Sequence, residues 1–179
     1  MLSRQPGRPD NTPRYAAPEP YPPIQVCGPN KKYAQMLKID LACPQSELTA
    51  VTQYVYQSWQ LDPKLSQVSN TMRHVAMVEM HHLDMLGQLI VLLGGNPTFS
   101  CRQQGRQIIW DGGMVTYCHD SLAQMMKENI AAEEFAIETY QRQINCIDDP
   151  NIVAILQRII LDEKVHLEIF HQYLAEAQC

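Results

Sequence analysis

The chain has 179 residues, of which 45% are hydrophobic and 18% are charged, so it suits one domain with a sizeable buried core. Its 14 Lys and Arg residues against 19 Asp and Glu residues give a formal net charge of −5. This acidic balance offers no electrostatic basis for binding nucleic acid, and no Lys/Arg cluster indicates binding to an anionic membrane surface.

The cysteines are scattered, and none forms a CxxC pair, which argues against a zinc ribbon or a rubredoxin-type iron site. A chain of this length builds a core without cross-links, so we expect free thiols in a reducing compartment, with a Cys27–Cys43 bridge as the alternative. The six are Cys27, Cys43, Cys101, Cys118, Cys146 and Cys179. No stretch reaches the roughly 18 apolar residues of a membrane span. We expect a cytoplasmic protein.

Residues 1–29 contain eight of the twelve prolines and no apolar run, which is not the pattern of a signal peptide. They predict an extended arm of polyproline-II character. Composition favours a disordered tail. The alternative is an arm that docks on a neighbouring subunit through Tyr15, Tyr21 and Ile24, contributing to assembly rather than chemistry. Residues 30–179 are expected to form the folded domain.

Helix-start and helix-stop signals divide the rest of the chain. Asp62-Pro63 and Asp149-Pro150 each place an N-cap before a proline at the first helical position, and Pro44 also suits a first turn. Gly94-Gly95 and Pro97 stop a helix. Asp120 is a candidate cap for the third long helix. The expected helices cover residues 31–41, 44–59, 63–93, 120–146 and 150–177.

About 25 irregular residues, from Gly94 to His119, separate the second and third long helices. This length is sufficient to carry the chain from one end of a bundle to the other. The pattern therefore predicts an all-α fold, a four-helix bundle with one long crossover between its second and third helices.

Two of these helices carry polar residues inside apolar stripes. In each, core positions recur in steps of three and four, the pattern of one buried helix face. Glu79 and His82 interrupt the first stripe, and Glu163 and His166 interrupt the second with the same spacing. The apolar positions are Leu65, Val68, Met72, Val75, Leu86, Leu89 and Leu93, then Ile152, Leu156, Ile159, Phe170 and Tyr173.

The other two long helices share a second pattern. Glu47 precedes Tyr54 by seven residues and Glu133 precedes Tyr140 by seven, so each pair points the same way two turns apart. The two leading glutamates lie 86 positions apart, whereas the stripe glutamates and the stripe histidines each lie 84 apart. This near-constant offset indicates a two-helix unit used twice.

Four carboxylates and two imidazoles thus converge on one core. Four ionised carboxylates buried together repel one another and carry a large desolvation cost, which a purely structural role does not explain. Two divalent cations would bring the cluster near neutrality. Oxygen and imidazole donors suit Fe or Mn, accept Zn, and disfavour thiolate-loving metals. The sequence therefore predicts a dinuclear metal site, and the donors leave iron and manganese both open.

Metal-binding histidines usually donate their second N–H to an orienting acceptor. Tyr54, Tyr140 and Asp162 are candidates for such supporting roles, and Asp162 has no acidic counterpart in the other half because Val78 precedes Glu79. Other acidic residues and histidines fall off the stripes, and we expect them on solvated faces. These are Glu128, Glu134, Glu138, Glu168, His74, His81 and His171.

At these residues the chain resembles the ferritin-like superfamily, over about residues 30–177. The donor set looks like that of bacterioferritin, and Met80 stands where bacterioferritins carry a haem-ligating methionine. A lone methionine is more typical of core or interface packing, so no haem is expected. The superfamily's architecture implies Glu47 and His82 on one ion, Glu133 and His166 on the other, and Glu79 and Glu163 as bridges.

Other segments resemble the manganese catalases, including their spore-coat relatives. These are ELTAVTQYVYQSW at 47–59, NIAAEEFAIETY at 129–140, and the crossover with Trp110, Gly112 and Val115 ahead of Asp120. In that family the fourth-helix glutamate, here Glu163, is often a supporting group rather than a ligand. Rubrerythrin is less similar, because its rubredoxin-type cysteines and its extra third-helix glutamate are absent.

The favoured interpretation is a di-iron protein that oxidises Fe(II) with O2 or H2O2 through the six metal-site residues. One alternative is a dimanganese catalase that disproportionates H2O2. Another is a structural coat-type protein in which metal only fastens the bundle, suited by the proline-rich arm and scattered cysteines. The resemblance also implies a homo-oligomer and, through the spore-coat relatives, a possible association with spores.

Overall fold

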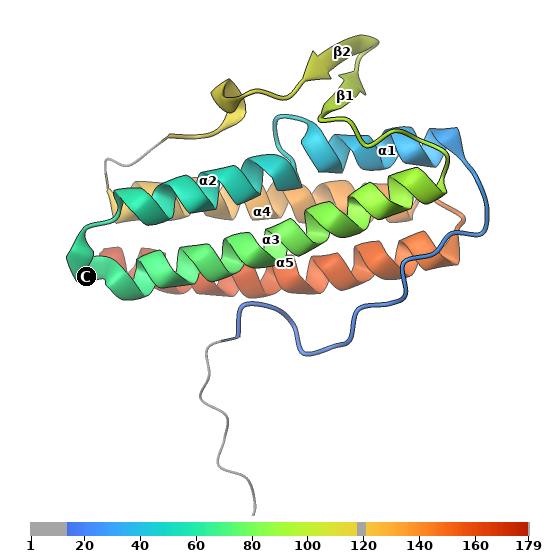
Figure 1. Ribbon diagram of the computed structural model, residues 1–179. Coiled ribbons are helices and arrows are strands. Elements are labelled where there is room, and N and C mark those ends of the chain that lie inside the picture. The colour runs from blue at the N-terminus through green and yellow to red at the C-terminus, as the bar shows by residue number, and fades with distance from the viewer. Residues whose placement is uncertain (1–13, 118–120, 179) are drawn as a thin grey trace, which may run out of the picture.

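The computed structural model describes residues 14–117 and 121–178. Four long helices, α2 (Glu47–Gln60), α3 (Ser66–Leu92), α4 (Leu122–Ile144) and α5 (Pro150–Ala177), pack as two helical hairpins, α2–α3 and α4–α5. A shorter helix, α1 (Lys31–Ala42), precedes them at one end of the bundle (Figure 1). The predicted four-helix bundle with a long crossover between its second and third helices is confirmed.

The observed helix starts follow local capping chemistry. Asp149 accepts hydrogen bonds from the backbone N–H groups of Asn151 and Ile152, as its sequence signal predicts. Asp62 instead caps a short 3-10 helix, Pro63–Leu65, and α3 begins only at Ser66.

The predicted start at Pro44 is wrong, because α2 begins at Glu47 after an extended Ser46. Asp120, the predicted cap of α4, lies outside the described residues. The N-cap there is Ser121, whose hydroxyl accepts a hydrogen bond from the backbone N–H of Gln124.

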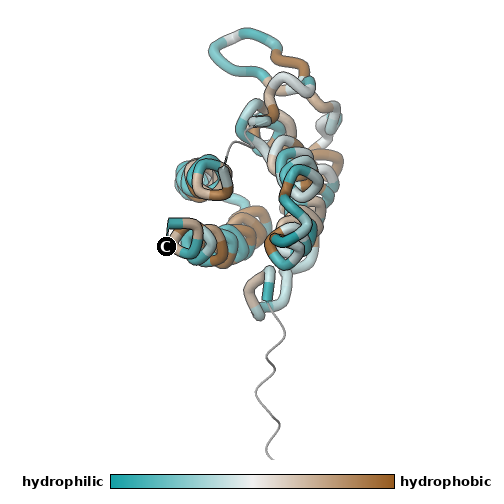
Figure 2. The backbone as a smooth tube through the Cα atoms, turned by 90° about the vertical axis from the view of Figure 1, so that its left-hand side faces the viewer, coloured by the Kyte–Doolittle hydropathy of each residue, from teal (hydrophilic) through white to brown (hydrophobic). Residues whose placement is uncertain are grey.

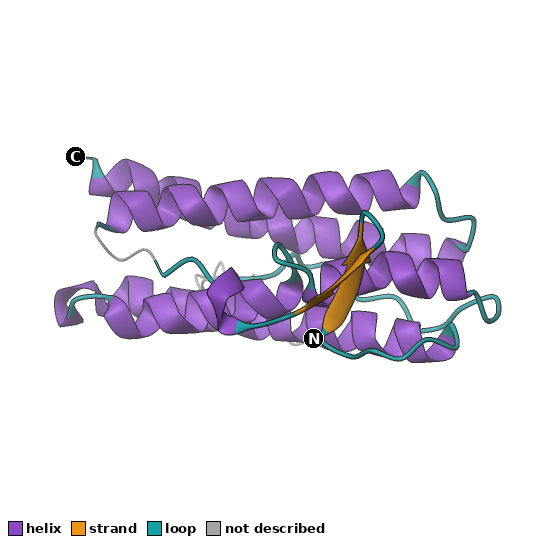
Figure 3. Ribbon diagram, turned by 90° about the horizontal axis from the view of Figure 1, so that it is seen from above, coloured by secondary structure: helices purple, strands orange, loops and turns teal. Residues whose placement is uncertain are grey.

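The sequence had predicted an irregular crossover, but part of it has regular structure. It contains an antiparallel hairpin of β1 (Ser100–Gln103) and β2 (Arg106–Ile109), followed by a 3-10 helix, Gly112–Met114. The two turn residues, Gln104 and Gly105, both have left-handed φ values, 50° and 77°, which suit a tight two-residue hairpin. Figure 3 shows this hairpin crossing the bundle beside α1.

A disulfide joins Cys43, at the end of α1, to Cys101 on β1, with their Cα atoms 5.6 Å apart. The prediction of free thiols is therefore wrong for this pair, and so is the alternative Cys27–Cys43 bridge. Packing of the hairpin on α1 brings the two residues together across 58 positions of sequence, which no local spacing reveals. Cys27 and Cys146 are free and exposed.

The apolar core consists of two clusters. One surrounds Leu86 and Ile159 near α1, and the other surrounds Met72 and Phe170 at the opposite end. Each buried side chain of this kind contributes about 1.5–3 kcal/mol relative to its exposed state, so the clusters supply the stability that lets a polar centre persist between them. The four helices enclose this interior in the end-on view of Figure 2.

The length and composition of α3 and its preceding turn, Pro63–Leu92, would also suit a membrane span, with a mean hydropathy of 1.2 in its most apolar window. Within the bundle, however, 44% of that window is buried, and the polar Glu79 and His82 lie on its inner face. The helix is therefore amphipathic, and its inner face belongs to the core of the bundle.

Residues 14–29 pack against α3 and α5 of the same chain, on the side of the bundle away from the hairpin (Figures 1 and 2). The Tyr15 ring stacks on His74 of α3 with ring centres 4.6 Å apart. The backbone N–H of Cys27 donates to Asp149 at 2.6 Å. Composition had favoured a disordered tail, but these sixteen residues form an ordered arm.

Removing the disulfide is expected to destabilise the domain without unfolding it. Replacing Cys43 and Cys101 together with serine should lower the free energy of unfolding by roughly 2–4 kcal/mol, because the unfolded chain regains the freedom of a long loop. Urea denaturation measures this loss. Cys146→Ser, at an exposed free thiol, is the control, and an equal stability of the double variant and wild type would contradict the prediction.

Candidate metal centre

The structure brings the six predicted metal-site residues together at the middle of the bundle. Each of the four helices contributes, and every one of the six side chains is at most 4% exposed. Their donor atoms form two groups, each with all atoms within 4.8 Å of one another. One group comprises Glu47, Glu79, His82 and Glu163, and the other comprises Glu79, Glu133, Glu163 and His166.

The two groups have nearly the same geometry around their histidines. The Nδ1 atom of His82 lies 3.0 Å from Glu79, 3.3 Å from Glu163 and 3.7 Å from Glu47. The Nδ1 atom of His166 lies 2.8 Å from Glu79, 3.0 Å from Glu163 and 3.7 Å from Glu133. Each imidazole thus directs one nitrogen into the centre, where three carboxylates meet it.

The outward nitrogens have different partners. The Nε2 atom of His82 lies 3.0 Å from Asp162, and that of His166 lies 3.0 Å from the backbone carbonyl of Tyr15. A carbonyl only accepts hydrogen bonds, so Nε2 of His166 must carry the proton. This arrangement leaves the lone pair of each Nδ1 atom as the one that could bind a cation.

Two tyrosines reach across the bundle. Tyr54 on α2 donates a hydrogen bond to Glu133 on α4 at 2.5 Å, and Tyr140 on α4 donates to Glu47 on α2. Burial, followed by the nearby carboxylate charges, raises the pKa of both phenols well above the usual value, so the hydroxyls remain protonated donors. They orient the two glutamates that each belong to one group only.

Protons partly neutralise the metal-free cluster. Burial, followed by the charges of Glu79 and Glu163, raises the pKa of Glu47 and Glu133 well above the usual range. Burial alone would lower the histidine pKa values, but the surrounding carboxylates raise both well above 6.5. Burial would raise the pKa of Glu79, yet the two histidines lower it below the ordinary value.

The donor set fits a pair of metal ions. Oε1 of Glu79 lies 2.8 Å from Nδ1 of His166, and Oε1 of Glu163 lies 3.3 Å from Nδ1 of His82, but neither buried oxygen has a hydrogen bond of good geometry. Both oxygens belong to the residues shared by both groups. Cations bound between the groups would satisfy them together with the Nδ1 atoms.

A cavity of about 150 Å³ adjoins the centre between α2 and α4. Its inner wall contains all four glutamates, and small side chains such as Ala50, Ala132 and Ala136 line its sides. The exposed Gln45 and Ala131 also contribute, so the cavity opens toward solvent. A small molecule of a few atoms fits this space.

Several buried polar residues near the site were not predicted. Gln53 and Gln57 of α2 bond with Asn129 of α4 at 2.7–3.0 Å and fix the separation of these helices. Arg158 forms a 2.7 Å ion pair with Asp162, one helical turn along α5. The spacing of four between Arg158 and Asp162 is a sequence signal for their ion pair, whereas no sequence signal indicated the hydrogen bonds to Asn129.

Asp162, a predicted supporting residue, lies at a junction of hydrogen bonds. Burial would raise its pKa, but hydrogen bonds from His82, Tyr21 and Arg158 outweigh burial and lower the pKa to about 2. Burial, followed by the bond to Asp162, raises the pKa of Tyr21 to about 12. Asp162 therefore remains an anionic acceptor for His82.

The residues expected on solvated faces divide into two sets. Five are exposed, namely Glu134, Glu138, Glu168, His81 and His171. Glu128 is half-buried beside the cavity, and His74 is half-buried beneath Tyr15. Met80 is 52% exposed on the outer face of α3, so it does not pack in the core of this chain.

This arrangement has the form of four-helix bundles that hold metal ions between facing helices. A family model described as a ferritin-like domain matches residues 44–179, and the chain belongs to this family. A bacterioferritin from Desulfovibrio desulfuricans is 28% identical over 128 residues. That match covers 69% of this chain and 65% of the relative, so the chain spans just under two thirds of the relative's length.

Solved structures share the fold. The manganese catalase KatB from Anabaena superposes with a TM-score of 0.78 at 24% identity, covering 89% of this chain and 78% of KatB. Rhodobacter capsulatus bacterioferritin gives a TM-score of 0.66 at 21% identity, with 84% and 88% covered. A dodecameric thioferritin from Bacteroides fragilis gives 0.65 at 21% identity, with 82% and 86% covered.

Metal content should respond differently to the shared and unshared glutamates. Glu79→Ala removes a donor from both groups and should weaken binding of both ions, whereas Glu133→Ala should leave about one ion per chain. Elemental analysis after anaerobic loading with Fe(II) or Mn(II) measures this. Glu134→Ala is the matched control, since its exposed side chain lies about 100° around the helix. At most one ion in wild type would contradict the dinuclear prediction.

Asp40 generates a pH-dependent prediction. It is buried at the cavity wall with Oδ2 unpartnered, and burial, partly offset by a hydrogen bond from Gln143, raises its pKa to about 8. A raised folded-state pKa gives a stability contribution that is present below the ordinary value of 3.8 and lost as the pH rises through about 8.

Asp40→Asn should therefore stabilise the metal-free protein by about 1–3 kcal/mol at about pH 9, and by less at about pH 5. Urea denaturation at the two pH values measures the difference between variant and wild type. Asp84→Asn, at an exposed position of α3, is the control. The same difference at both pH values would show that Asp40 does not titrate as described.

Proposed function

We propose that this chain is a dinuclear metal-carboxylate protein that oxidises Fe(II) with O2 or H2O2. The observation that carries the proposal is the sharing of Glu79 and Glu163 between both donor groups. Two bridging carboxylates, flanked by one glutamate and one histidine on each side, suit a pair of ions that act together. The bacterioferritin relative and the bacterioferritin-like fold support the same function.

When bound, two redox-active ions would exchange electrons with an oxidant that needs more than one. The protein's own groups prepare the site for this chemistry. The Nε2 partners fix the imidazole rings, and Tyr54 and Tyr140 hold the outer glutamates. The alanine-lined cavity admits Fe(II) and a small oxidant from the α2–α4 side, and the apolar clusters at both ends keep bulk water from the centre.

A second candidate is a dimanganese catalase that disproportionates H2O2. The observation that favours it is the superposition on KatB, with a TM-score of 0.78 against 0.66 for the Rhodobacter bacterioferritin. The oxygen-rich donor set accepts manganese as readily as iron. In this function Glu163 would support the site rather than bind both ions.

We also propose that the protein is a homo-oligomer. The dodecameric thioferritin supports this assembly. So do large apolar side chains left exposed on the outer face of α3 and the adjoining loop, which exceed the isolated exposed residues of a typical monomer. These are Met77, Met80, Val91, Leu92 and Phe99, each 44–65% exposed.

One variant under two metals tests the proposed function. Fe(II) added aerobically to wild type should give ferric absorbance faster than in buffer, and Glu163→Ala should remove most of this acceleration because both ions lose a donor. If manganese is the native metal, Mn-loaded wild type should evolve oxygen from H2O2, and Glu163→Ala should slow turnover while both ions remain bound. Glu168→Ala, exposed on the same helix, is the control. Failure of wild type in both assays would favour a structural coat-type role.

A further inference from the structure

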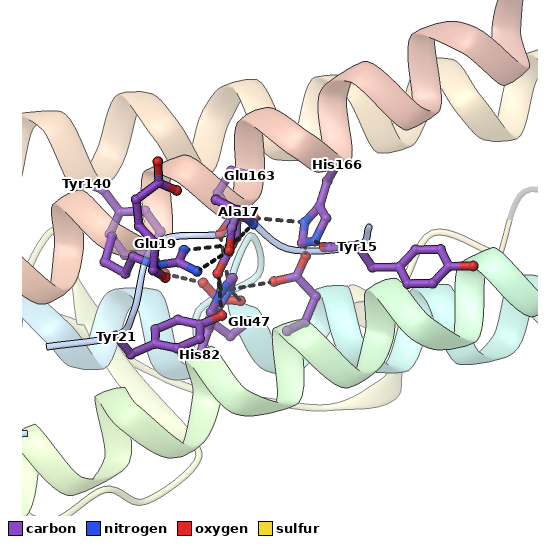
Figure 4. Close-up of polar contacts among 12 residues, drawn as sticks. Tyr15, Ala17, Glu19, Tyr21, Glu47, His82, Tyr140, Glu163 and His166 are labelled. Carbon is purple, nitrogen blue, oxygen red and sulfur yellow. Dashed lines mark hydrogen bonds and ion pairs between the residues drawn. The ribbon is translucent and has the colours of Figure 1, made fainter. Parts of the chain in front are cut away.

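Residues 15–21 of the arm, here called the docked segment, cross the seam between α3 and α5 directly outside the two histidines (Figure 4). The Tyr15 and Tyr21 rings contact His74 and His81 on α3, with ring centres 4.6 Å apart in both pairs. The backbone of the segment bonds to α5. The docked segment therefore contacts both α3, which carries Glu79 and His82, and α5, which carries Glu163 and His166.

On one half of the site the docked segment contacts the histidine directly. The carbonyl of Tyr15 accepts the Nε2 proton of His166 at 3.0 Å. Arg158 holds this stretch of backbone in place by donating to the carbonyls of Ala17 and Glu19 at 2.8 and 2.7 Å. Among the described contacts, this carbonyl is the one acceptor that faces Nε2 of His166.

On the other half the docked segment acts through Asp162. The backbone N–H of Ala17 donates to Oδ1 of Asp162 at 2.7 Å, and the Tyr21 hydroxyl donates to Oδ2 at 2.5 Å. The same Oδ2 accepts from Nε2 of His82 at 3.0 Å. Tyr21 thus orients the Asp162 carboxylate, which in turn orients the His82 imidazole. The Arg158 guanidinium lies over the Tyr21 ring, 4.0 Å from its centre.

We propose that the docked segment is a positioning element of the metal centre, which supplies the outer hydrogen-bond partners that orient both imidazoles. The inference rests on the proposed dinuclear site. It differs from the sequence-based expectation that the arm serves assembly rather than chemistry. Partners of this kind set the orientation and basicity of a metal-binding histidine, and losing one typically lowers metal affinity by about 10–100-fold.

A conservative pair of variants tests the Asp162 half. Tyr21→Phe removes one hydroxyl from the docked segment but keeps the ring over Arg158, and it should weaken Co(II) binding by about 10-fold. Tyr33→Phe is the control, because the Tyr33 hydroxyl also makes one hydrogen bond, which it accepts from the backbone N–H of Asp148 at 3.1 Å, far from the site. Equal Co(II) affinity of the two variants would overturn the role of Tyr21.

A pair of truncations tests the backbone contact to His166. Removing residues 1–13 keeps every described contact of the arm, whereas removing residues 1–21 deletes the docked segment. In metal-free protein, NMR should show slowly exchanging Nε2 protons of His82 and His166 in the shorter truncation. The longer one should lose the His166 signal, while circular dichroism should show the same helical content. Co(II) affinity should fall at least about 10-fold only in the longer truncation.

The two readouts separate the inference from the function on which it rests. Equal protection of the Nε2 protons and equal Co(II) affinity in both truncations would overturn the positioning role. Wild-type protein that binds fewer than two Co(II) ions, yet shows the protected protons, would instead contradict the proposed dinuclear site. The NMR signal distinguishes positioning from a general loss of stability, since unfolding would remove both histidine signals and the helical content together.

Discussion

The structure depends on one electrostatic constraint, the burial of four carboxylates and two imidazoles in a single centre. Each inward Nδ1 atom meets three carboxylate oxygens, more than one proton can satisfy. Charge must therefore be compensated from within, by protons in the metal-free protein or by cations. The two apolar clusters supply the stability against which this cost is set, and they place the centre midway along the helices.

The two halves of the site match in their inner donor atoms but differ in the partners of their outer histidine nitrogens. The two halves present matching donors to the centre, but His82 is backed by an ionised carboxylate and His166 by a neutral carbonyl. A carboxylate acceptor raises the basicity of its imidazole more than a carbonyl does. Two ions bound in this site would thus occupy unequal environments.

The two sides of the centre also differ in access. The cavity opens between α2 and α4, where small side chains leave room for a small molecule. The arm covers the opposite seam, between α3 and α5, and its aromatic rings cover His74 and His81 there. Exchange with solvent is therefore directed to one side, and the covered side can be devoted to holding the histidines.

The sequence alone determined the four long helices and the six residues that converge, because helical periodicity and capping are local and the Glu and His residues interrupt apolar stripes at fixed spacing. It also singled out Tyr54 and Tyr140, which share helix faces with Glu47 and Glu133, and Asp162, which directly precedes Glu163. Tertiary structure decided the rest. The Cys43–Cys101 bridge, the hairpin's position and the contact of Tyr15 with His166 join residues far apart in sequence, and the last of these uses a backbone carbonyl, which no residue type encodes.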